Sequence, residues 1–335
     1  MKSQLITTAL TTALALAAAS AQDDGIATFT KKAADAAKTE LPAGQTGVAG
    51  ADPEWYFFYK ELAHLGTGEF WSGDYSGTAA KTDPVPLITE YSNSLKQLGV
   101  ELLVVPVPAK ASIYPQQFTA EGSAQALAPF LKSLSDAGVK VLDLEPIFQA
   151  ELKKNPEKPL YCKTDSHYSP YATQLIAGLI HDTYKDEEWV KGISSDIEFT
   201  SAPPKDLEIK GDLTADQTET LSAVEVTSAS GDPVTPDDAA SPIVLLGDSH
   251  TAVFSSGGEL HATGCGLPDH LQAKFGAKIH QVSNNGSGTH QARIQLLRKA
   301  HSTPGYWDDK KLVIWHFSAR EFTQAPKWVK IPPKP

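Results

Sequence analysis

The chain is poor in cysteine and in positive charge, and each shortage excludes a class of protein. Its 335 residues include only 2 Cys, which cannot by themselves complete a closed zinc site. The 29 Lys and Arg residues are outnumbered by 40 Asp and Glu, giving a formal net charge of −11. We therefore expect no nucleic-acid partner. A polyanionic polysaccharide remains compatible with this charge, provided that the fold builds a local basic groove.

After residue 21, no segment has the unbroken apolar length of a membrane-spanning helix. The N-terminus carries a shorter apolar run, which follows Lys2, extends over Leu5–Ala18 and precedes the small residues Ala19, Ser20 and Ala21. This order is typical of a secretory signal peptide cleaved after Ala21, so residues 1–21 are predicted to be that signal. The alternative is an uncleaved anchor at the membrane interface. Either way, we expect the body of the protein to be periplasmic or secreted.

Composition divides the remaining chain into two parts, the second of which contains an insertion. Residues 22–50 are rich in Ala, Gly, Lys and Thr without a sustained apolar period, which predicts a flexible leader or at most a marginal helix. Residues 51–335 are expected to form a single domain. Within it, residues 186–241 are acidic and rich in Ser, Thr, Asp and Pro, which predicts an irregular insertion or a small strand pair at the surface.

Short apolar runs alternate with amphipathic helical patterns in the rest of the domain. Helical patterns that end at Gly99 and Gly138 are each followed by a run typical of a buried strand, and three more such runs occur in the second half. The five expected strands are Val100–Val105, Val139–Leu144, Ile243–Leu246, Ala277–Val282 and Leu312–Phe317, with helices at Leu267–Phe275 and Gln291–Ala300. This order predicts a three-layer, doubly wound α/β fold around a parallel sheet of about five strands. In such folds the ligand crevice lies at the carboxyl ends of the strands.

One of these strand ends carries a candidate nucleophile. In the segment SPIVLLGDSHT, a strand runs into Gly247 and Ser249 follows immediately. A serine in this position can project into the crevice, and its backbone N–H can help to form an oxyanion pocket. The alternative is a residue that merely caps the next helix.

A serine nucleophile needs a base and a group that orients the base. In YCKTDSHYSP, Asp165 and His167 are two residues apart, so an extended loop would point both side chains to the same side, where the carboxylate can hold the imidazole Nδ1–H. His250 is a poorer base, because it directly follows Ser249 and adjacent side chains usually point apart. Ser169 and the residue after it are expected to cap and begin a helix.

Two plainer interpretations of the same segment stay open. The Asp-Ser-His sequence is also typical of an ordinary polar turn. A metal site built from Asp165, His167 and His181 lacks an obvious third close ligand, so we predict neither a metal nor a cofactor. The two cysteines, Cys162 and Cys265, lie near these motifs and form either a disulfide that holds the site or two separate buried thiols.

Other strand ends supply candidate binding groups. Asn284, Asn285 and Gly286 in QVSNNGSGTHQ could donate amide groups to an oxyanion or a sugar hydroxyl, or simply form a turn between a strand and a helix. Arg320, just beyond the last strand, could bind an anionic sugar or pair with a surface carboxylate.

These motifs, in this order, resemble the alginate O-acetyltransferase family of SGNH-hydrolase-like proteins, the AlgJ and AlgX type. The resemblance extends over about residues 51 to 325 and is carried by WYFFYKELAHLGTGEFW, DPVPLITEYSNSLKQLGVELLVVPVPAKASIYP, LYCKTDSHYSPYAT, KGDLT, LLGDSHTAVF and VIWHFSAREF. It implies an SGNH-like fold and an exported enzyme that acetylates hydroxyls of an exopolysaccharide.

The resemblance also implies roles for individual residues. By motif match, Ser249 would be the nucleophile, His167 the general base and Asp165 the residue that orients it. The Asp-His pair precedes the serine here, unlike in ordinary SGNH hydrolases. Tyr168 stands where the family usually has Trp, a change expected to affect the pocket wall. Because the chain ends soon after Arg320, the single-domain AlgJ type is expected. A membrane-bound O-acyltransferase that supplies the acetyl group is the implied partner, beside the polysaccharide acceptor.

Two other functions compete with acetyl transfer. A carbohydrate acetylesterase would use the same triad, with water in place of the sugar hydroxyl. A non-catalytic polysaccharide-binding component of an export complex has no physical reason to keep Ser249, His167 and Asp165 together.

Overall fold

The computed structural model describes residues 22–193 and 196–334, so the predicted signal peptide lies outside the described residues. Its centre is a five-stranded sheet in the order β10-β9-β11-β3-β4, in which every neighbouring pair is parallel. The strands are β3 (Glu101–Val107), β4 (Lys140–Val141), β9 (Ile243–Gly247), β10 (His280–Ser283) and β11 (Leu312–Ser318).

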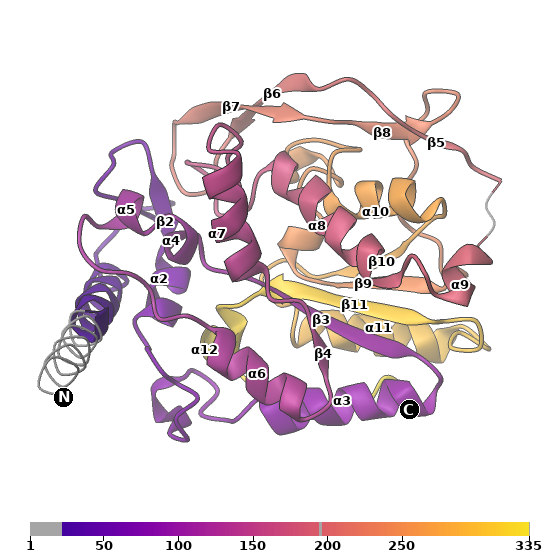
Figure 1. Cartoon of the computed structure of the whole chain (residues 1–335), viewed down its shortest axis with the longest axis horizontal. Coiled ribbons are helices and arrows are strands. Elements are labelled where there is room, and N and C mark those ends of the chain that lie inside the picture. The colour runs from indigo at the N-terminus through magenta and orange to yellow at the C-terminus, as the bar shows by residue number, and fades with distance from the viewer. Residues whose placement is uncertain (1–21, 194–195, 335) are drawn as a thin grey trace, which may run out of the picture.

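Helices cover both faces of this sheet (Figure 1). One face carries α3 (Val85–Gln97), α6 (Ala128–Asp136) and α11 (Gln291–Ser302). The other carries α7 (Leu144–Lys154), α8 (Pro170–Tyr184) and α10 (Leu267–Phe275). The predicted three-layer α/β fold is therefore confirmed.

The alternation of side chains along each strand divides the core into two clusters. In β11, Leu312 and Ile314 pack into the cluster beneath α7, α8 and α10, whereas Val313 and Trp315 pack into the cluster beneath α3, α6 and α11. Both kinds of position are fully buried, which explains why the strand reads as one continuous apolar run.

Two predicted strands differ from the structure at their ends. The run Val139–Leu144 contributes only Lys140–Val141 to the sheet, because Asp143 caps α7 by accepting a hydrogen bond from the Glu145 backbone N–H at 3.1 Å. Strand β10 begins at His280, three residues later than predicted. Ser169 does cap α8, since its hydroxyl accepts from the Ala172 N–H at 3.2 Å.

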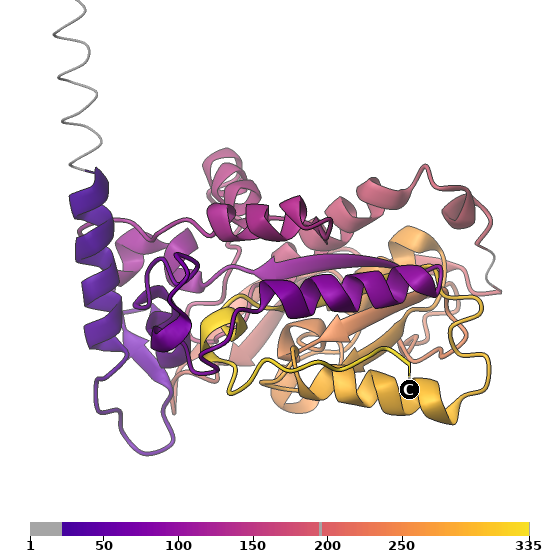
Figure 2. The same cartoon turned by 90° about the horizontal axis from the view of Figure 1, so that it is seen from below.

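Of the two alternatives for residues 22–50, a flexible leader and a marginal helix, the structure has the helix over the first part of the segment. Residues 22–36 are helical, and Phe29 and Ala33, one turn apart, are fully buried in the main core. Strand β1 (Gly47–Ala49) then pairs with β2 (Tyr56–Phe58). Figure 2 shows this helix standing at one end of the molecule, beside the β1–β2 pair.

The segment predicted as an irregular insertion or a small strand pair forms two antiparallel strand pairs. Strand β5 (Phe199–Ser201) pairs with β8 (Val226–Ser228), and β6 (Lys205–Lys210) pairs with β7 (Thr218–Ala223). Leu221 and Ala223 of β7 are buried in the main core, so this segment covers the α8 side of the molecule. The short helices are α2 (Tyr59–Leu65), α4 (Lys110–Ile113), α5 (Pro115–Phe118), α9 (Glu188–Lys191) and α12 (Glu321–Gln324), with 3-10 turns η1 (Tyr75–Gly77), η2 (Ser249–Thr251) and η3 (Gly258–Leu260).

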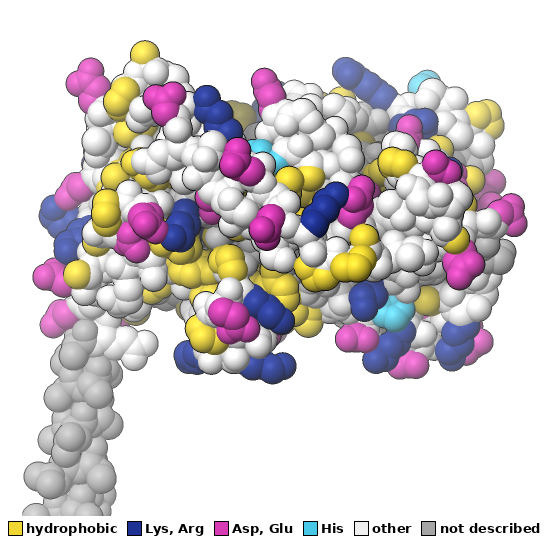
Figure 3. Space-filling model, turned by 90° about the horizontal axis from the view of Figure 1, so that it is seen from above, with side chains coloured by type: hydrophobic (Ala, Val, Ile, Leu, Met, Phe, Trp, Pro, Cys, Tyr) yellow, Lys and Arg dark blue, Asp and Glu magenta, His cyan; other side chains and the backbone are white. Residues whose placement is uncertain are grey.

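Burial decides between the two alternatives for the cysteines. Cys162 and Cys265 are both buried free thiols, so the disulfide alternative is wrong. Among the helices of the described residues, none is both long and apolar enough to cross a bilayer. On the face shown in Figure 3, basic and acidic side chains are interspersed rather than gathered into a continuous stripe of one sign.

Candidate active site

Ser249 lies just past the carboxyl end of β9, at the edge of the sheet where the ligand crevice was expected. Strand β9 ends at Gly247, where a Cβ would lie 1.8 Å from the His316 carbonyl oxygen of neighbouring β11, so no other residue fits there. The buried Asp248 side chain then caps turn η2 by accepting from the His250 N–H at 3.0 Å. The Ser249 side chain is left partly exposed at the start of this turn.

Asp165 and His167 come from the loop between α7 and α8, and their side chains join Ser249 in one hydrogen-bonded chain. His167 Nε2 lies 2.7 Å from Ser249 Oγ, and His167 Nδ1 lies 2.6 Å from Asp165 Oδ1. The same Asp165 oxygen also accepts the His167 backbone N–H at 2.9 Å, a local turn that sets the two side chains side by side. Asp165 is 1% exposed and His167 is 5% exposed, so this polar contact is shielded from bulk water.

Three other segments hold Asp165 in place. Its second oxygen, Oδ2, accepts the Asp212 backbone N–H at 3.0 Å and faces His261 Nε2 at 2.9 Å. Its carbonyl oxygen accepts from the Lys110 ammonium at 2.6 Å. Lys110 is fully buried and also donates to the Tyr56 carbonyl at 2.7 Å, so it joins the Asp165 loop to the β2 region.

These contacts shift the ionisation of the pair in opposite directions. Burial alone would raise the pKa of Asp165, but the charges and hydrogen bonds of His167 and His261 outweigh burial and hold this pKa well below its usual range. Burial also opposes the charged form of His167, yet Asp165 more than offsets it, and Asp212 and Asp248 act in the same direction, so the pKa of His167 is raised. The arrangement is an ionised carboxylate that strengthens a neighbouring base.

Tyr168 lies behind the site rather than in its wall, which corrects the expectation that it shapes the pocket. Its ring is fully buried. Its hydroxyl donates to the His250 carbonyl oxygen and lies 3.2 Å from His316 Nε2. The His250 ring in turn packs against the rings of Tyr168 and His167, with centroids 5.2 and 4.9 Å away. Tyr168 therefore supports the turn that carries Ser249.

The residues predicted to bind an oxyanion differ in whether they have a donor group available to do so. The backbone N–H of Ser249 donates to no group in the described part of the chain. Asn284 is half-buried and its own backbone N–H is taken by the Gly247 carbonyl at 2.9 Å, which leaves its side-chain amide as its candidate donor. Asn285 and Gly286 lie in an exposed turn. Gly288, rather than Gly286, presses on the Ser249 turn, since a Cβ there would be 2.8 Å from the Asp248 nitrogen.

Arg320 begins the segment that follows β11 and is only 9% exposed. Its guanidinium carbon lies 5.2 Å from the centre of the Phe58 ring. The structure therefore does not place it in a surface ion pair, and a cation remains buried at the carboxyl end of the sheet. Burial raises the pKa of Glu61, and the positive charge of Arg320 partly offsets this increase.

A family model for the SGNH hydrolase-like domain of the acetyltransferase AlgX matches residues 48–319. The chain belongs to this family. Curated relatives agree with that assignment: "Probable alginate O-acetylase AlgJ" of Azotobacter vinelandii is 29% identical over 42% of this chain and 34% of the relative, and "Alginate biosynthesis protein AlgX" of Pseudomonas putida is 25% identical over 69% of this chain and 50% of the relative. The matched regions thus span half or less of these relatives' length.

Solved structures of the AlgX family share the fold. The O-acetyltransferase domain of Pseudomonas putida AlgJ superposes with a TM-score of 0.59 at 18% identity, covering 83% of this chain and 92% of that domain. Pseudomonas aeruginosa AlgX superposes with a TM-score of 0.58 at 18% identity, covering 86% of this chain and 65% of AlgX.

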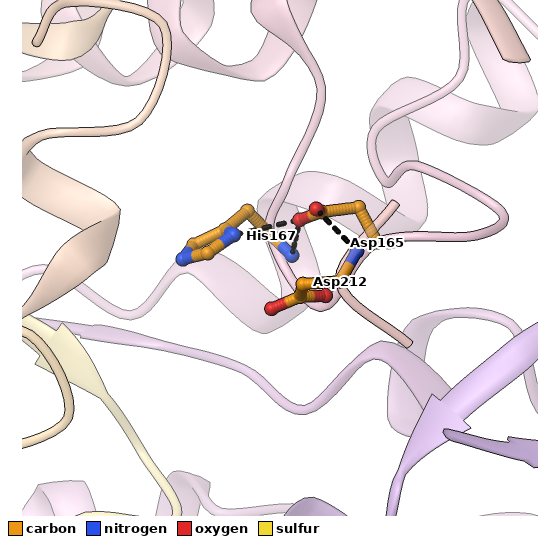
Figure 4. A group of neighbouring side chains, drawn as sticks. All are labelled: Asp165, His167 and Asp212. Atoms are coloured by element: carbon orange, nitrogen blue, oxygen red, sulfur yellow. Dashed lines mark hydrogen bonds and ion pairs between the residues drawn. The ribbon is translucent and has the colours of Figure 1, made fainter. Parts of the chain in front are cut away.

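A metal alternative can be tested against the donor groups of this AlgX-family site. Asp165, His167 and Asp212 have potential ligand atoms within 4.8 Å of one another, and Figure 4 shows the three side chains converging. Both Asp165 oxygens already accept hydrogen bonds, and Asp212 accepts the backbone N–H and hydroxyl of Ser166 at 2.6 and 2.7 Å. His181 is not in this group; it lies on α8 with its ring against Phe275. The donor set therefore fits a hydrogen-bonded dyad better than a metal.

Several residues that build the AlgX-family site were not among the predicted site residues. Asp212 comes from the segment predicted as an irregular insertion, and Glu219 of β7 accepts the Lys163 and Thr164 N–H groups at 2.9 and 2.8 Å. Lys110 and His261 were also missed. The KGDLT motif, which holds Asp212, was a visible clue, because a short motif inside a weakly patterned segment suggests a contact made elsewhere.

Proposed function

We propose that this protein is an O-acetyltransferase that moves an acetyl group, through an acetyl-Ser249 intermediate, to a hydroxyl of an exopolysaccharide, with alginate as the first candidate. The observation that carries the proposal is the unbroken chain from Asp165 through His167 to Ser249, with contacts of 2.6 and 2.7 Å, in a member of an acetyltransferase family. The names of the curated relatives supply the polymer.

The first half of the reaction forms the acetyl-enzyme. His167 Nε2 takes the proton of Ser249 Oγ while that oxygen attacks the carbonyl carbon of the acetyl donor. The negative charge that develops on the carbonyl oxygen is stabilised by the Ser249 N–H and the Asn284 side-chain amide. The intermediate then expels the donor's leaving group, which receives the proton from His167. Each oxyanion donor is worth about 3 kcal/mol of barrier, so their placement matters nearly as much as the nucleophile.

The second half transfers the acetyl group. A hydroxyl of the acceptor gives its proton to His167 Nε2 and attacks the acetyl-serine carbonyl, and the proton then returns to Ser249 Oγ as the ester breaks. Asp165 keeps the imidazole oriented throughout and stabilises its charged form. Arg320, a buried cation at the same end of the sheet, is the candidate group for holding an acidic sugar.

We further propose where the protein acts and which partner supplies its acetyl groups. Because residues 1–21 are predicted to be a signal peptide, we propose that the protein acts in the periplasm or outside the cell. The acetyl-coenzyme donors of the cytoplasm are not available there. A membrane-bound O-acyltransferase that passes acetyl groups across the membrane is therefore the proposed donor partner.

Hydrolysis is the second candidate function, because the Ser249 side chain is partly exposed and water can reach an acetyl-enzyme. Purified protein is incubated with an activated aryl acetate and with oligouronates or neutral oligosaccharides, and acetylated sugar is quantified by mass spectrometry. The proposal predicts acetylated oligouronate that disappears in Ser249→Ala and persists in the matched control Ser302→Ala, on the exposed end of α11. Aryl acetate turnover that no sugar intercepts would instead establish an esterase.

A further inference from the structure

Asp165 is shared by two histidines, and the proposed mechanism uses only one of them. His167 Nδ1 lies 2.6 Å from Oδ1, and His261 Nε2 lies 2.9 Å from Oδ2. The His261 side chain is 7% exposed, so this second contact is as well shielded from water as the first. Among the hydrogen bonds of the described residues, none joins His261 to Ser249, and the link from His261 to His167 runs through the Asp165 carboxylate.

The backbone that delivers His261 is strained. His261 has φ 74° and ψ −86°, a backbone conformation that residues other than glycine rarely adopt. Phe254, at the start of the same loop, also has a positive φ of 61°, and its ring lies 5.4 Å from the His261 ring. Backbone hydrogen bonds hold the loop in this form, including Phe254 N–H to the Leu260 carbonyl at 2.8 Å and Gly257 N–H to the Ala262 carbonyl at 2.9 Å. Strain of this kind persists where the surrounding structure enforces it, often at functional sites.

We propose that His261 is a positioning residue for acetyl transfer: its Nε2–H holds Oδ2 of Asp165, which fixes Oδ1 on His167 and limits how strongly the carboxylate draws a proton onto His167. This inference rests on the proposed function of the same site. A carboxylate that also accepts a hydrogen bond from His261 stabilises the protonated form of His167 less. His167 therefore remains unprotonated, and able to act as a base, at lower pH.

Other titratable groups lie near Asp165 and His167 and also affect the ionisation of these two residues. Asp165 is approached by the Lys110 ammonium from α4, by Asp212 from the β6–β7 loop and by the Cys162 thiol of its own loop. Asp212 and Asp248 both favour a charged His167. The His250 ring packs on His167. None of these groups donates a side-chain hydrogen bond to Oδ2, so loss of His261 removes a contact that they do not replace.

Two substitutions separate the hydrogen bond from the bulk of the side chain. His261→Gln keeps an N–H donor, whereas His261→Met keeps similar size and loses the donor. His261→Gly also lacks the donor and suits the positive φ, so it supplies a folded donor-free variant if the Met variant fails to fold. His301→Gln, at an exposed position of α11, is the matched control.

The first readout does not depend on acetyl chemistry. In nitrogen-15-labelled protein, the titration of the His167 imidazole is followed by NMR, and its midpoint is expected to rise in the donor-free variants and to stay near the natural value in His261→Gln and His301→Gln. The same midpoint in all variants would overturn the inference. If no variant, nor the natural protein, shows acetyl chemistry, the proposed function fails while this titration still decides the role of His261.

The second readout is the pH profile of aryl acetate turnover. Donor-free variants are expected to lose about tenfold in kcat with KM unchanged, the loss expected for one hydrogen bond to a charged group, and their acid limb should move to higher pH. Equal losses in His261→Gln and His261→Met, with no movement of the acid limb, would show a purely structural role and overturn the inference.

Discussion

Replacing Gly211 with alanine should disable the site, although Gly211 touches none of the reacting groups. An alanine Cβ at this position would lie 2.0 Å from the Thr164 carbonyl oxygen and 2.3 Å from its carbonyl carbon. Ordinary contacts for such atoms begin near 3.4 Å, so one loop must retreat by more than 1 Å. The retreat breaks the Leu213 N–H bond to the Thr164 carbonyl at 3.1 Å and the Asp212 N–H bond to Asp165 at 3.0 Å.

The size of the effect follows from that displacement. A misplacement of about 1 Å in a catalytic constellation can cost about 100-fold in rate, and overpacking costs about 1–3 kcal/mol of stability. We therefore expect Gly211→Ala to lower kcat/KM for an aryl acetate by about 100-fold while the protein still folds.

The assay pairs turnover with a thermal melt, and the chain offers a matched control. Gly178, within α8, has open space where its Cβ would be, so Gly178→Ala should leave kcat/KM unchanged and raise stability by about 0.5–1 kcal/mol. If Gly211→Ala kept kcat/KM within twofold of the natural protein, the Gly211–Thr164 contact would not be what positions Asp165, and the reasoning would be refuted.

Four further outcomes are expected. Because the pKa of His167 is raised, kcat/KM should rise with pH around a midpoint above the usual histidine value near 6.5; a midpoint below that value would contradict the shift. The free energy of unfolding should also depend on pH. The stabilisation that follows from the raised pKa of His167 is largest at low pH and is lost as pH rises through the folded-state pKa, whereas the stabilisation that follows from the lowered pKa of Asp165 is present above about pH 4 and is lost on acidification. Urea unfolding at several pH values would measure both changes. Lys110→Met leaves the Asp165 and Tyr56 carbonyls without their donor, so we expect a loss of about 2 kcal/mol in urea unfolding together with a lower kcat, and an unchanged unfolding midpoint would count against this role. Tyr168→Phe should lower the melting temperature without changing KM for the acceptor, because the ring is fully buried; the reverse pattern would return Tyr168 to the pocket wall.

The sheet and the reacting groups were predictable because their signals are local. A buried parallel strand such as β11 reads as a continuous apolar run, and the residue after its carboxyl end falls in the crevice by topology alone. The spacing of Asp165 and His167 predicts that both side chains point to the same side. In the structure one Asp165 oxygen reaches both the backbone N–H and the ring of His167.

The supporting groups were not predictable because they act across long sequence separations. Asp212 and His261 reach Asp165 from 47 and 96 residues away, and neither segment carries an apolar period that would fix its place. The helix over residues 22–36 could be predicted only as a marginal alternative for a related reason. Only Phe29 and Ala33 anchor it fully, which is too few apolar positions to show a helical period in an alanine-rich stretch.

The central claim is that Ser249 carries the acetyl group, and peptide mass spectrometry of the briefly acetylated protein tests it most directly. The protein is mixed with an activated aryl acetate, quenched in acid and digested. The account predicts one acetyl group on the peptide that contains Ser249, absent in Ser249→Ala and strongly reduced in Asp165→Asn, and discharged when oligouronate is added before the quench. Acetylation that is spread over surface lysines, or that persists unchanged in Ser249→Ala, would contradict it.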